Sequence, residues 1–435
     1  MNIIAIFFAT LIVVSIFTTF IMPVMATDTV AWDRTFGGFW WDGAQSVQQT
    51  TDGGFIIVGV TNSFGAGDRD VWLIKTDVSG NEEWNRTFGK SGREGAFSVQ
   101  QTTDGGFIMA GRTDSIGAGY RDMWLIKTDA AGNKEWDRAF GGSDWDGAQS
   151  VQQTEDGGFI IAGTTQSFGA GKSDFWLIKT DAAGNKEWNR TFGGSDWDSA
   201  WSVQQTADNG FIIAGVTDSF GAGYRDMWLI KTDAAGNKEW DRTFGGLGDD
   251  WAFSVQQTKN SGFIIAGETD SFRMGNIDDV WLVKTDAFGN EEWNRTFGGF
   301  YLDSAQSVQQ TKDGGFIIAG KTKSFGAGGS DVWIVKTDYA GNKEWNHTLG
   351  GSDRDLARSI QQTSNGGFII AGETESFGVG ADIGWLGNFW MVKVGPEGII
   401  LPELGPEPEF EIPGFGIVVT IISLLGAILL FKKKD

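Results

Sequence analysis

The sequence predicts an all-β repeat protein, and three observations support this prediction. The motif Ser-Val-Gln-Gln-Thr, with Ile in place of Val once, recurs seven times in the 435 residues, at steps of 52 or 53 residues. Between the copies lie short runs rich in Val, Ile, Phe, Trp and Thr, separated by Gly, Asp and Asn, which is the pattern of strands joined by tight turns. No long stretch shows the 3.6-residue period of a helix. The copies begin at Ser46, Ser98, Ser150, Ser202, Ser254, Ser307 and Ser359.

Each repeat predicts four strands. The first is Ala-x-Ser-Val-Gln-Gln-Thr, and a turn such as Asp-Gly-Gly leads to the second, Gly-Phe-Ile-Ile-Ala-Gly, as at residues 158–163. A longer Ser-Phe-Gly-Ala-Gly loop precedes the third strand, Asp-Val-Trp-Leu-Ile-Lys-Thr-Asp. The turn Ala-Gly-Asn precedes the fourth, Lys-Glu-Trp-Asn-Arg-Thr-Phe-Gly-Gly. Four strands in about fifty residues form the blade of a β-propeller, so we predict a ring of seven four-stranded blades.

The two ends of the repeat region indicate how the ring closes. The last repeat ends with its third strand at Val394, just before Pro396, and therefore lacks an outer strand of its own. An unassigned outer-strand pattern, residues 31–38, precedes the first repeat. We predict that this N-terminal segment completes the seventh blade, which removes an exposed sheet edge.

The repeats resemble two known groups of propellers. Phe-Ile-Ile-Ala-Gly stands in place of the di-glycine strand of a kelch-like blade. The aromatic pair in Trp-Leu-Ile-Lys and the following Glu-Trp is similar to the aromatic pair of such a blade. The run from Thr-Phe-Gly-Gly through Gly-Asn-x-x-Trp resembles tandem propeller repeats of archaeal surface proteins. The resemblance covers residues 31–395 and implies the fold, whereas propellers host unrelated activities.

Both chain ends carry membrane-targeting signals. Residues 1–26 form a long apolar run without a charge, which predicts a secretory signal peptide cleaved after Ala26, with an uncleaved anchor as the alternative. Residues 415–431 are seventeen uncharged, mostly apolar residues followed by three lysines, which predicts a membrane helix with a cytoplasmic end. The propeller, residues 27–395, is then extracellular, and the Pro- and Glu-rich residues 396–412 form a semi-extended stalk.

The triplet Pro413, Gly414 and Phe415, the short apolar segment after it and the basic terminus resemble the PGF-CTERM sorting signal of archaeal surface proteins. Pro-Glu-Phe just upstream resembles the related PEF-CTERM signal. The resemblance implies that an archaeosortase cuts near the triplet in residues 413–435 and that a lipid replaces the helix. An ordinary C-terminal membrane helix is the alternative, and either one places the protein on the cell surface.

Composition excludes several classes of function. The chain has no cysteine, which excludes disulfides and thiolate chemistry. Its single histidine, His347, excludes a multi-histidine metal site and any Ser-His-Asp triad that does not include His347. Lys and Arg total 34 against 56 Asp and Glu, a net charge of -22. Such a polyanion is repelled by phosphate backbones, so we predict no nucleic-acid partner.

One face of the predicted disc carries most of the irregularity between repeats. Fourteen of the 21 tryptophans occupy fixed third- and fourth-strand positions, which predicts packing between blades. The other seven, with nearby tyrosine and arginine side chains, fall in the loops after the second and fourth strands or at the start of the first strand. We predict that this face binds an envelope glycan or protein through Trp40, Trp41, Arg93, Trp145, Trp197, Trp201, Trp251, Tyr301, Arg354, Arg358 and Trp385.

Carboxylates recur in two further sets, one four residues before each conserved Ser and one just before most third-strand tryptophans. They could together hold Ca²⁺, but strict repetition favours capping of local turns through backbone N–H groups, so we predict no metal and no cofactor. The first set is Asp42, Glu94, Asp146, Asp198, Asp250, Asp303 and Asp355, and the second is Asp70, Asp122, Asp174, Asp226, Asp279 and Asp331, with Asn388 in the seventh place.

Four Asn-x-Thr sequons fall on outer strands and are candidate N-glycosylation sites in an exported protein. Because Asp occupies the same position in other repeats, simple alternation of Asn and Asp at an exposed position is the competing explanation. The four asparagines are Asn85, Asn189, Asn294 and Asn346.

Taken together, these patterns favour a surface-anchored, non-enzymatic propeller that binds glycans or proteins of the cell envelope. A structural envelope component without a selective ligand is the first alternative. A carboxylate-based glycoside hydrolase is the second, although no pair of carboxylates departs from the sevenfold pattern.

Overall fold

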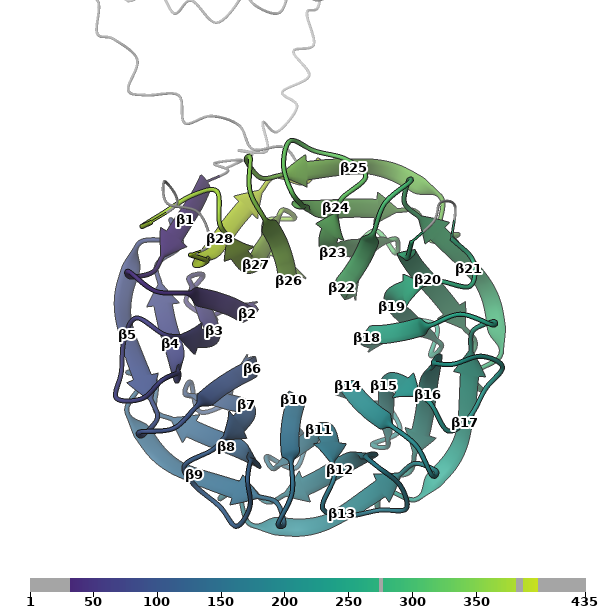
Figure 1. The fold of residues 1–435 in the computed structure, drawn as a ribbon, viewed down its shortest axis with the longest axis horizontal. Coiled ribbons are helices and arrows are strands. Elements are labelled where there is room, and N and C mark those ends of the chain that lie inside the picture. Colours follow the sequence, from purple (N-terminus) through teal and green to yellow (C-terminus); the bar gives the residue numbers. More distant parts are fainter. Residues whose placement is uncertain (1–31, 274–276, 381–385, 398–435) are drawn as a thin grey trace, which may run out of the picture. The chain divides into compact units, whose positions relative to one another are not determined.

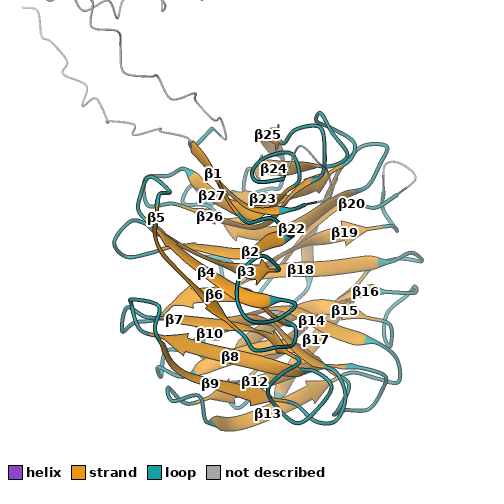
Figure 2. Ribbon diagram, turned by 60° about the vertical axis from the view of Figure 1, so that its left-hand side comes forward, coloured by secondary structure: helices purple, strands orange, loops and turns teal. Residues whose placement is uncertain are grey.

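The protein is a seven-bladed β-propeller, as predicted. The computed structural model describes residues 32–273, 277–380 and 386–397, and these contain seven antiparallel four-stranded sheets and no helix. The sheets are arranged as blades around a central channel (Figure 1). Loops and hairpins project from both ends of the strands (Figure 2). The predicted signal peptide, most of the stalk and the C-terminal helix lie outside the described residues.

The strands follow the repeat period. Blade 1 is β2 (Asp42–Gln49), β3 (Phe55–Thr61), β4 (Asp70–Thr76) and β5 (Glu82–Phe88). Blade 2 is β6 (Glu94–Gln101), β7 (Phe107–Thr113), β8 (Asp122–Thr128) and β9 (Lys134–Phe140). Blade 3 is β10 (Asp146–Gln153), β11 (Phe159–Thr165), β12 (Asp174–Thr180) and β13 (Lys186–Phe192). Blade 4 is β14 (Asp198–Gln205), β15 (Phe211–Thr217), β16 (Asp226–Thr232) and β17 (Lys238–Phe244).

The remaining blades have the same plan. Blade 5 is β18 (Asp250–Gln257), β19 (Phe263–Thr269), β20 (Asp279–Thr285) and β21 (Glu291–Phe297). Blade 6 is β22 (Asp303–Gln310), β23 (Phe316–Thr322), β24 (Asp331–Thr337) and β25 (Lys343–Leu349). Blade 7 is β26 (Asp355–Gln362), β27 (Phe368–Thr374), β28 (Asn388–Val394) and the N-terminal β1 (Trp32–Phe36).

The ring closes through β1, which confirms the prediction from the unpaired N-terminal segment. β1 pairs antiparallel with β28, in a register that runs from Trp32 opposite Lys393 to Phe36 opposite Phe389. The first and last strands of the chain therefore share one sheet (Figure 1).

The hydrophobic core is divided into layers between neighbouring blades. In one layer, Ile56 and Leu73 of blade 1 pack with Phe107 and Trp124 of blade 2, and all four side chains are buried. Outer-strand tryptophans complete these layers; Trp84, for example, lies with its ring centroid 5.9 Å from that of Phe107 in the next blade. The regular tryptophans thus pack between blades, as predicted.

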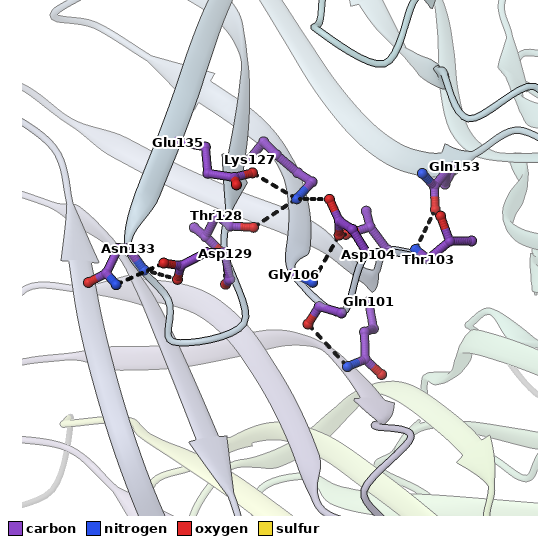
Figure 3. A network of polar contacts seen from close by, with 12 residues as sticks. Gln101, Thr103, Asp104, Gly106, Lys127, Thr128, Asp129, Asn133, Glu135 and Gln153 are labelled. Atoms are coloured by element: carbon purple, nitrogen blue, oxygen red, sulfur yellow. Dashed lines mark hydrogen bonds and ion pairs between the residues drawn. The ribbon is translucent and has the colours of Figure 1, made fainter.

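A buried lysine ties three segments together in blades 1–4 and 6, and Figure 3 shows the example in blade 2. In blade 2, Lys127 Nζ lies 2.9 Å from Asp104 in the turn after the first strand and 3.0 Å from Glu135 on the outer strand. It also donates a hydrogen bond to the Thr128 carbonyl oxygen at 2.9 Å. In blade 5 the turn aspartate is replaced by Asn260, and Lys284 pairs with Glu292.

These networks predict a loss of stability in acid. Burial disfavours the charged Asp104, but hydrogen bonds from Thr102, Lys127 and the Gly106 backbone outweigh it and lower the pKa to about 2. Asp156 has a pKa of about 2 in the same environment. Because these folded-state pKa values lie below the ordinary 3.8, the stabilisation is present above about pH 4 and is lost as the pH falls towards 2.

We therefore expect the urea midpoint of unfolding, followed by tryptophan fluorescence, to fall between pH 5 and pH 2. The double variant Asp104→Asn/Asp156→Asn should show a smaller fall. Burial and a neighbouring carboxylate raise the pKa of Asp70, Asp174 and Asp226, so these groups oppose the trend in both proteins. If the urea midpoint fell equally with pH in the two proteins, Asp104 and Asp156 would not be the source of the loss of stability in acid.

Candidate functional site

The segments that follow the second and fourth strands of each blade lie on one face of the ring, which we call the loop face. They are joined from blade to blade by short parallel bridges, such as Arg121 opposite Trp145 and Ser173 opposite Trp197. The Asp198 N–H also donates to the Ser173 carbonyl oxygen at 2.9 Å. Each loop that follows a second strand is thereby fixed to the start of the next blade.

A β-bulge explains why one position of the first strand varies. In blade 3, Ala148 pairs with Gly163 and Ser150 with Ala162, so Gln149 is an extra residue outside the ladder. The same register shift occurs in every blade, for example between Ala200 and Ser202. Bulges redirect side chains, so this position tolerates Gln, Phe, Trp or Arg without disturbing the pairing.

A cavity of about 590 Å³ opens on the loop face and brings four of the predicted residues together. Its lining includes Trp145 before blade 3, Trp197 and Trp201 of blade 4, and Trp251 of blade 5. The structure thus gathers these tryptophans from three consecutive blades into one concave, largely aromatic site.

The four indoles differ in what already covers them. Trp251 lies between Phe253, stacked at 6.1 Å and 18°, and the Arg225 guanidinium, 4.8 Å from its ring centroid. Trp145 and Trp197 make no aromatic or cation–π contact with other described residues. They occupy equivalent positions in adjacent repeats. Trp197 is exposed, and Trp145 is half-buried with its ring close to Gly147, so no aromatic ring or cation competes with a ligand for either indole.

Polar groups of the lining are also available to a ligand. The Trp201 Nε1–H is buried and has no hydrogen-bond acceptor within the described part of the chain. An unpaired buried donor is unfavourable, and because this atom has almost no exposed surface, an acceptor on a bound molecule would reach it only if neighbouring side chains moved. Thr164 and Ser199, whose hydroxyl oxygens lie 2.5 Å apart, add further donors and acceptors.

One ion pair lines the cavity beside the aromatic side chains. Arg225 Nε lies 3.2 Å from Asp218 Oδ1. Burial raises the pKa of Asp218, while Arg225 acts in the opposite direction. Both residues also line a second cavity of about 360 Å³ with Tyr224 and Leu247, so the two cavities adjoin.

Three residues that the sequence did not indicate, Tyr120, Asp218 and Arg225, also line the main cavity. In the loop between the second and third strands, Tyr120 is the first residue after a Gly-Ala-Gly motif and Arg225 is the second residue after the equivalent motif of blade 4. The residues at these two positions differ between repeats, and that variation was the available signal.

The other predicted residues do not line this cavity. Trp40 is exposed beside Phe39, and Tyr301 is exposed beside Phe300. Arg69 covers Trp41 at 5.7 Å. The predicted arginines make ion pairs instead: Arg93 lies 3.5 Å from Asp68, and Arg354 and Arg358 lie 3.8 and 3.5 Å from Glu373. Trp385 lies outside the described residues.

The repeated carboxylates cap backbone turns, as the repetition indicates. Asp198 Oδ2 accepts hydrogen bonds from the Gly194 N–H at 2.8 Å and the Ser219 hydroxyl at 2.7 Å. In the second set, Asp70 accepts from the N–H groups of Ala66 and Gly67, both at 2.9 Å. Within the described ranges no group of three or more His, Asp or Glu residues is arranged to hold a metal ion.

The sequon asparagines have a structural partner. The indole N–H of each third-strand tryptophan donates to the side-chain oxygen at this outer-strand position, as from Trp72 to Asn85 at 3.3 Å and from Trp124 to Asp137 at 3.1 Å. Asn and Asp both offer that oxygen, which explains why they alternate. The asparagines Asn85, Asn189, Asn294 and Asn346 all accept this bond, and their glycosylation stays a prediction.

Comparison with known families bears on the chain terminus. Residues 412–434 match the PGF-CTERM motif. This motif marks C-terminally anchored cell-surface proteins of archaea and implies processing by an archaeosortase and attachment to the membrane. The predicted sorting signal and surface location are confirmed, whereas an archaeal source and a kelch-like subtype stay predictions. Among the described residues no helix is both long and apolar enough to cross a membrane.

Similarity to other proteins is confined to part of a sequence or to the fold. The chain is 24% identical over 202 residues to the regulatory protein FlaEY of Caulobacter vibrioides, covering 40% of this chain and 21% of that protein. The match therefore spans about a fifth of the relative's length.

Two solved structures show a low-scoring similarity to this chain. The Pan2 WD40 domain of Neurospora crassa is 11% identical, with a TM-score of 0.49 and coverage of 82% of this chain and 90% of that one. Sqt1 of Chaetomium thermophilum is 11% identical, with a TM-score of 0.46 and coverage of 79% and 82%. We transfer no function from either protein.

Proposed function

We propose that this surface-anchored propeller is a non-enzymatic receptor for an envelope glycan, which it binds in the tryptophan-lined cavity. The observation that carries the proposal is the gathering of Trp145, Trp197, Trp201 and Trp251 around one cavity of about 590 Å³. Apolar sugar faces stack on uncovered indoles, and sugar hydroxyls bond to the polar groups between them. The hydroxyl groups of Thr164 and Ser199 in the lining support an oxygen-rich ligand.

The positions of the two ends of the propeller agree with glycan binding on the loop face. β1 begins at Trp32, which is paired with Lys393 near the end of β28, so both ends of the propeller emerge opposite the loop face. His347 Nε2 lies 2.7 Å from the carbonyl oxygen of Glu397, which secures the chain where the stalk begins. The two ends of the described propeller are therefore on the face opposite the cavity.

A binding experiment tests the proposal. We expect the polysaccharide fraction of the cell envelope, or neutral hexasaccharides as defined probes, to quench tryptophan fluorescence of the full propeller. Trp145→Ala and Trp197→Ala should each weaken binding about tenfold, equivalent to about 1.4 kcal/mol, because each removes one stacking surface. Trp40→Ala, on the same face but outside the cavity, is the matched control and should bind normally.

The outcomes separate recognition from a purely structural role. Absence of binding by any glycan fraction, or equal affinity in all three variants, would contradict the proposal. Capture of a protein that depends on Trp145 and Trp197, without glycan binding, would assign the cavity to a protein partner instead.

Glycoside hydrolysis is a second candidate because Asp144 and Asp218 both line the cavity. Burial raises the pKa of Asp218, which suits a general acid, whereas its ion pair with Arg225 favours the charged form. The non-enzymatic proposal predicts that wild-type protein releases no reducing ends from the bound glycan. Release that is abolished in Asp218→Asn, with binding retained, would establish the hydrolase.

A further inference from the structure

The central channel contains a ring of amide groups near the hairpins that follow the first strands. A cavity of about 250 Å³ lies there, lined by the first glutamine of the Gln-Gln pair in blades 2–7 and by the Val or Ile residue just before it in all seven blades. The ring runs from blade 1, with Gln48, to blade 7, with Gln361. It is separate from the tryptophan-lined cavity, which has none of these residues in its lining.

Each ring glutamine has a fixed orientation. Its Oε1 accepts the backbone N–H of the second glutamine in the next blade, as from Gln101 to Gln48 at 2.6 Å and from Gln257 to Gln204 at 2.6 Å. The last bond closes the circle from Gln49 N–H to Gln361 Oε1, also at 2.6 Å. A carboxamide has one acceptor and one donor end, so these bonds prevent the amide from flipping.

The donor ends of the ring glutamines remain unused. The second glutamine of a pair donates its Nε2 to a carbonyl of its own turn, as from Gln49 to Gly53 at 3.2 Å. For the first glutamines, such as Gln152 and Gln204, the described part of the chain provides no acceptor for Nε2. The neutral NH₂ groups of these glutamines are therefore available to a ligand, and six of the seven glutamines line the channel cavity.

The lining of the channel itself is uncharged, whereas an adjoining cavity that shares Gln100 and Gln152 also includes the carboxylate of Glu155. The channel lining contains only Val, Ile and Gln, with no carboxylate. At this end, Lys259 Nζ donates to the Lys312 carbonyl oxygen at 3.0 Å, and Lys312 Nζ donates to the Ser364 carbonyl oxygen at 2.8 Å. Neither lysine has an ion pair with a carboxylate of the described residues, so both charges stay uncompensated at contact distance.

We propose that the amide ring binds a partly hydrated halide ion, chloride under ordinary conditions, on the channel axis. A ring of equivalent donors suits a spherical acceptor, which accepts hydrogen bonds from all directions, better than a directional one. The volume is several times that of one water molecule, about 30 Å³, so the ion keeps part of its hydration shell. A single ion would then be shared by all seven blades.

Bromide, an anomalous scatterer, is the probe for this site. We expect a bromide-soaked crystal of the propeller to show an anomalous peak on the channel axis at the level of Gln204. Replacing sodium gluconate by sodium bromide at constant ionic strength should also raise the melting temperature, since a ligand that binds only the folded state stabilises it.

One substitution separates the donor role from the structural role. Gln204→Glu keeps an oxygen acceptor for the Gln257 N–H but replaces the NH₂ donor by a negative oxygen, so the peak and the bromide-dependent shift should be lost while the fold persists. Gln149→Glu, a bulge residue that adds the same charge to the first strand of blade 3, is the control and should retain both.

The result is decided by the peak. An empty channel in the bromide-soaked wild type, or an equal peak in Gln204→Glu, would overturn the proposal. Circular dichroism and the melting temperature in gluconate report whether Gln204→Glu folds. If it does not fold, Gln152→Glu, with the equivalent hydrogen bond to Gln205, gives the same comparison one blade earlier.

Discussion

Deletion of residues 32–37 is expected to abolish cooperative folding of the propeller. The deletion removes β1, so β28 becomes an exposed edge and Trp390 loses the Asp33 carboxylate to which its indole N–H donates at 3.2 Å. It also removes Trp32, which is buried against Phe55 of blade 1 at 5.7 Å. Loss of a buried Trp side chain alone costs about 3–5 kcal/mol, a large part of the stability of an ordinary domain.

The measurement is urea unfolding combined with size-exclusion chromatography. The deleted protein should show a broad, early transition and should self-associate through the open sheet edge. The control is a permuted chain in which residues 31–38 follow Val394 through an Ala-Gly-Asn turn like those between other third and fourth strands. It should regain the sharp transition, because blade 7 is complete again. A deleted protein as stable as the wild type would show that β1 does not close the ring.

The architecture was predictable because repetition makes the period visible. Seven copies of one motif set the number of blades, and the missing outer strand after Val394 identified the partner for the N-terminal segment. The strand bounds follow the same period in every blade, so one correctly interpreted repeat predicts all the others.

The site was only partly predictable, since it depends on how irregular residues from different repeats meet. The sequence places Trp145, Trp197 and Trp251 on one face but does not reveal that Arg225 covers Trp251 while the other two stay free. That contact joins a loop of blade 4 to a first strand of blade 5. The bulge at residues such as Gln149 shows in the sequence only as a position that varies, and the sequence does not reveal which way those side chains turn.

Asp198→Ala is expected to lower the free energy of unfolding by about 2–4 kcal/mol and to weaken glycan binding. The change leaves the Gly194 N–H and the Ser219 hydroxyl without the carboxylate that binds both. Both groups are half-buried, so each loss lies toward the lower end of the about 1–3 kcal/mol that an unpaired buried group costs. Asp198 directly follows Trp197, so release of this loop also releases one of the two free stacking surfaces.

The conservative variant identifies the role of the carboxylate. Asp198→Asn keeps one oxygen as an acceptor and should therefore lose less than half as much stability as Asp198→Ala. For each of the three proteins, the urea midpoint in calcium chloride should equal its own midpoint in EDTA. The reason is that the carboxylate acts by accepting hydrogen bonds from the backbone and a serine, and not by binding a metal ion. A calcium-dependent wild type, together with an Asn variant as unstable as the Ala variant, would instead assign Asp198 to a metal site. In that case the neighbouring Asp174, whose pKa burial and the charge of Asp198 both raise, would be the first additional ligand to test.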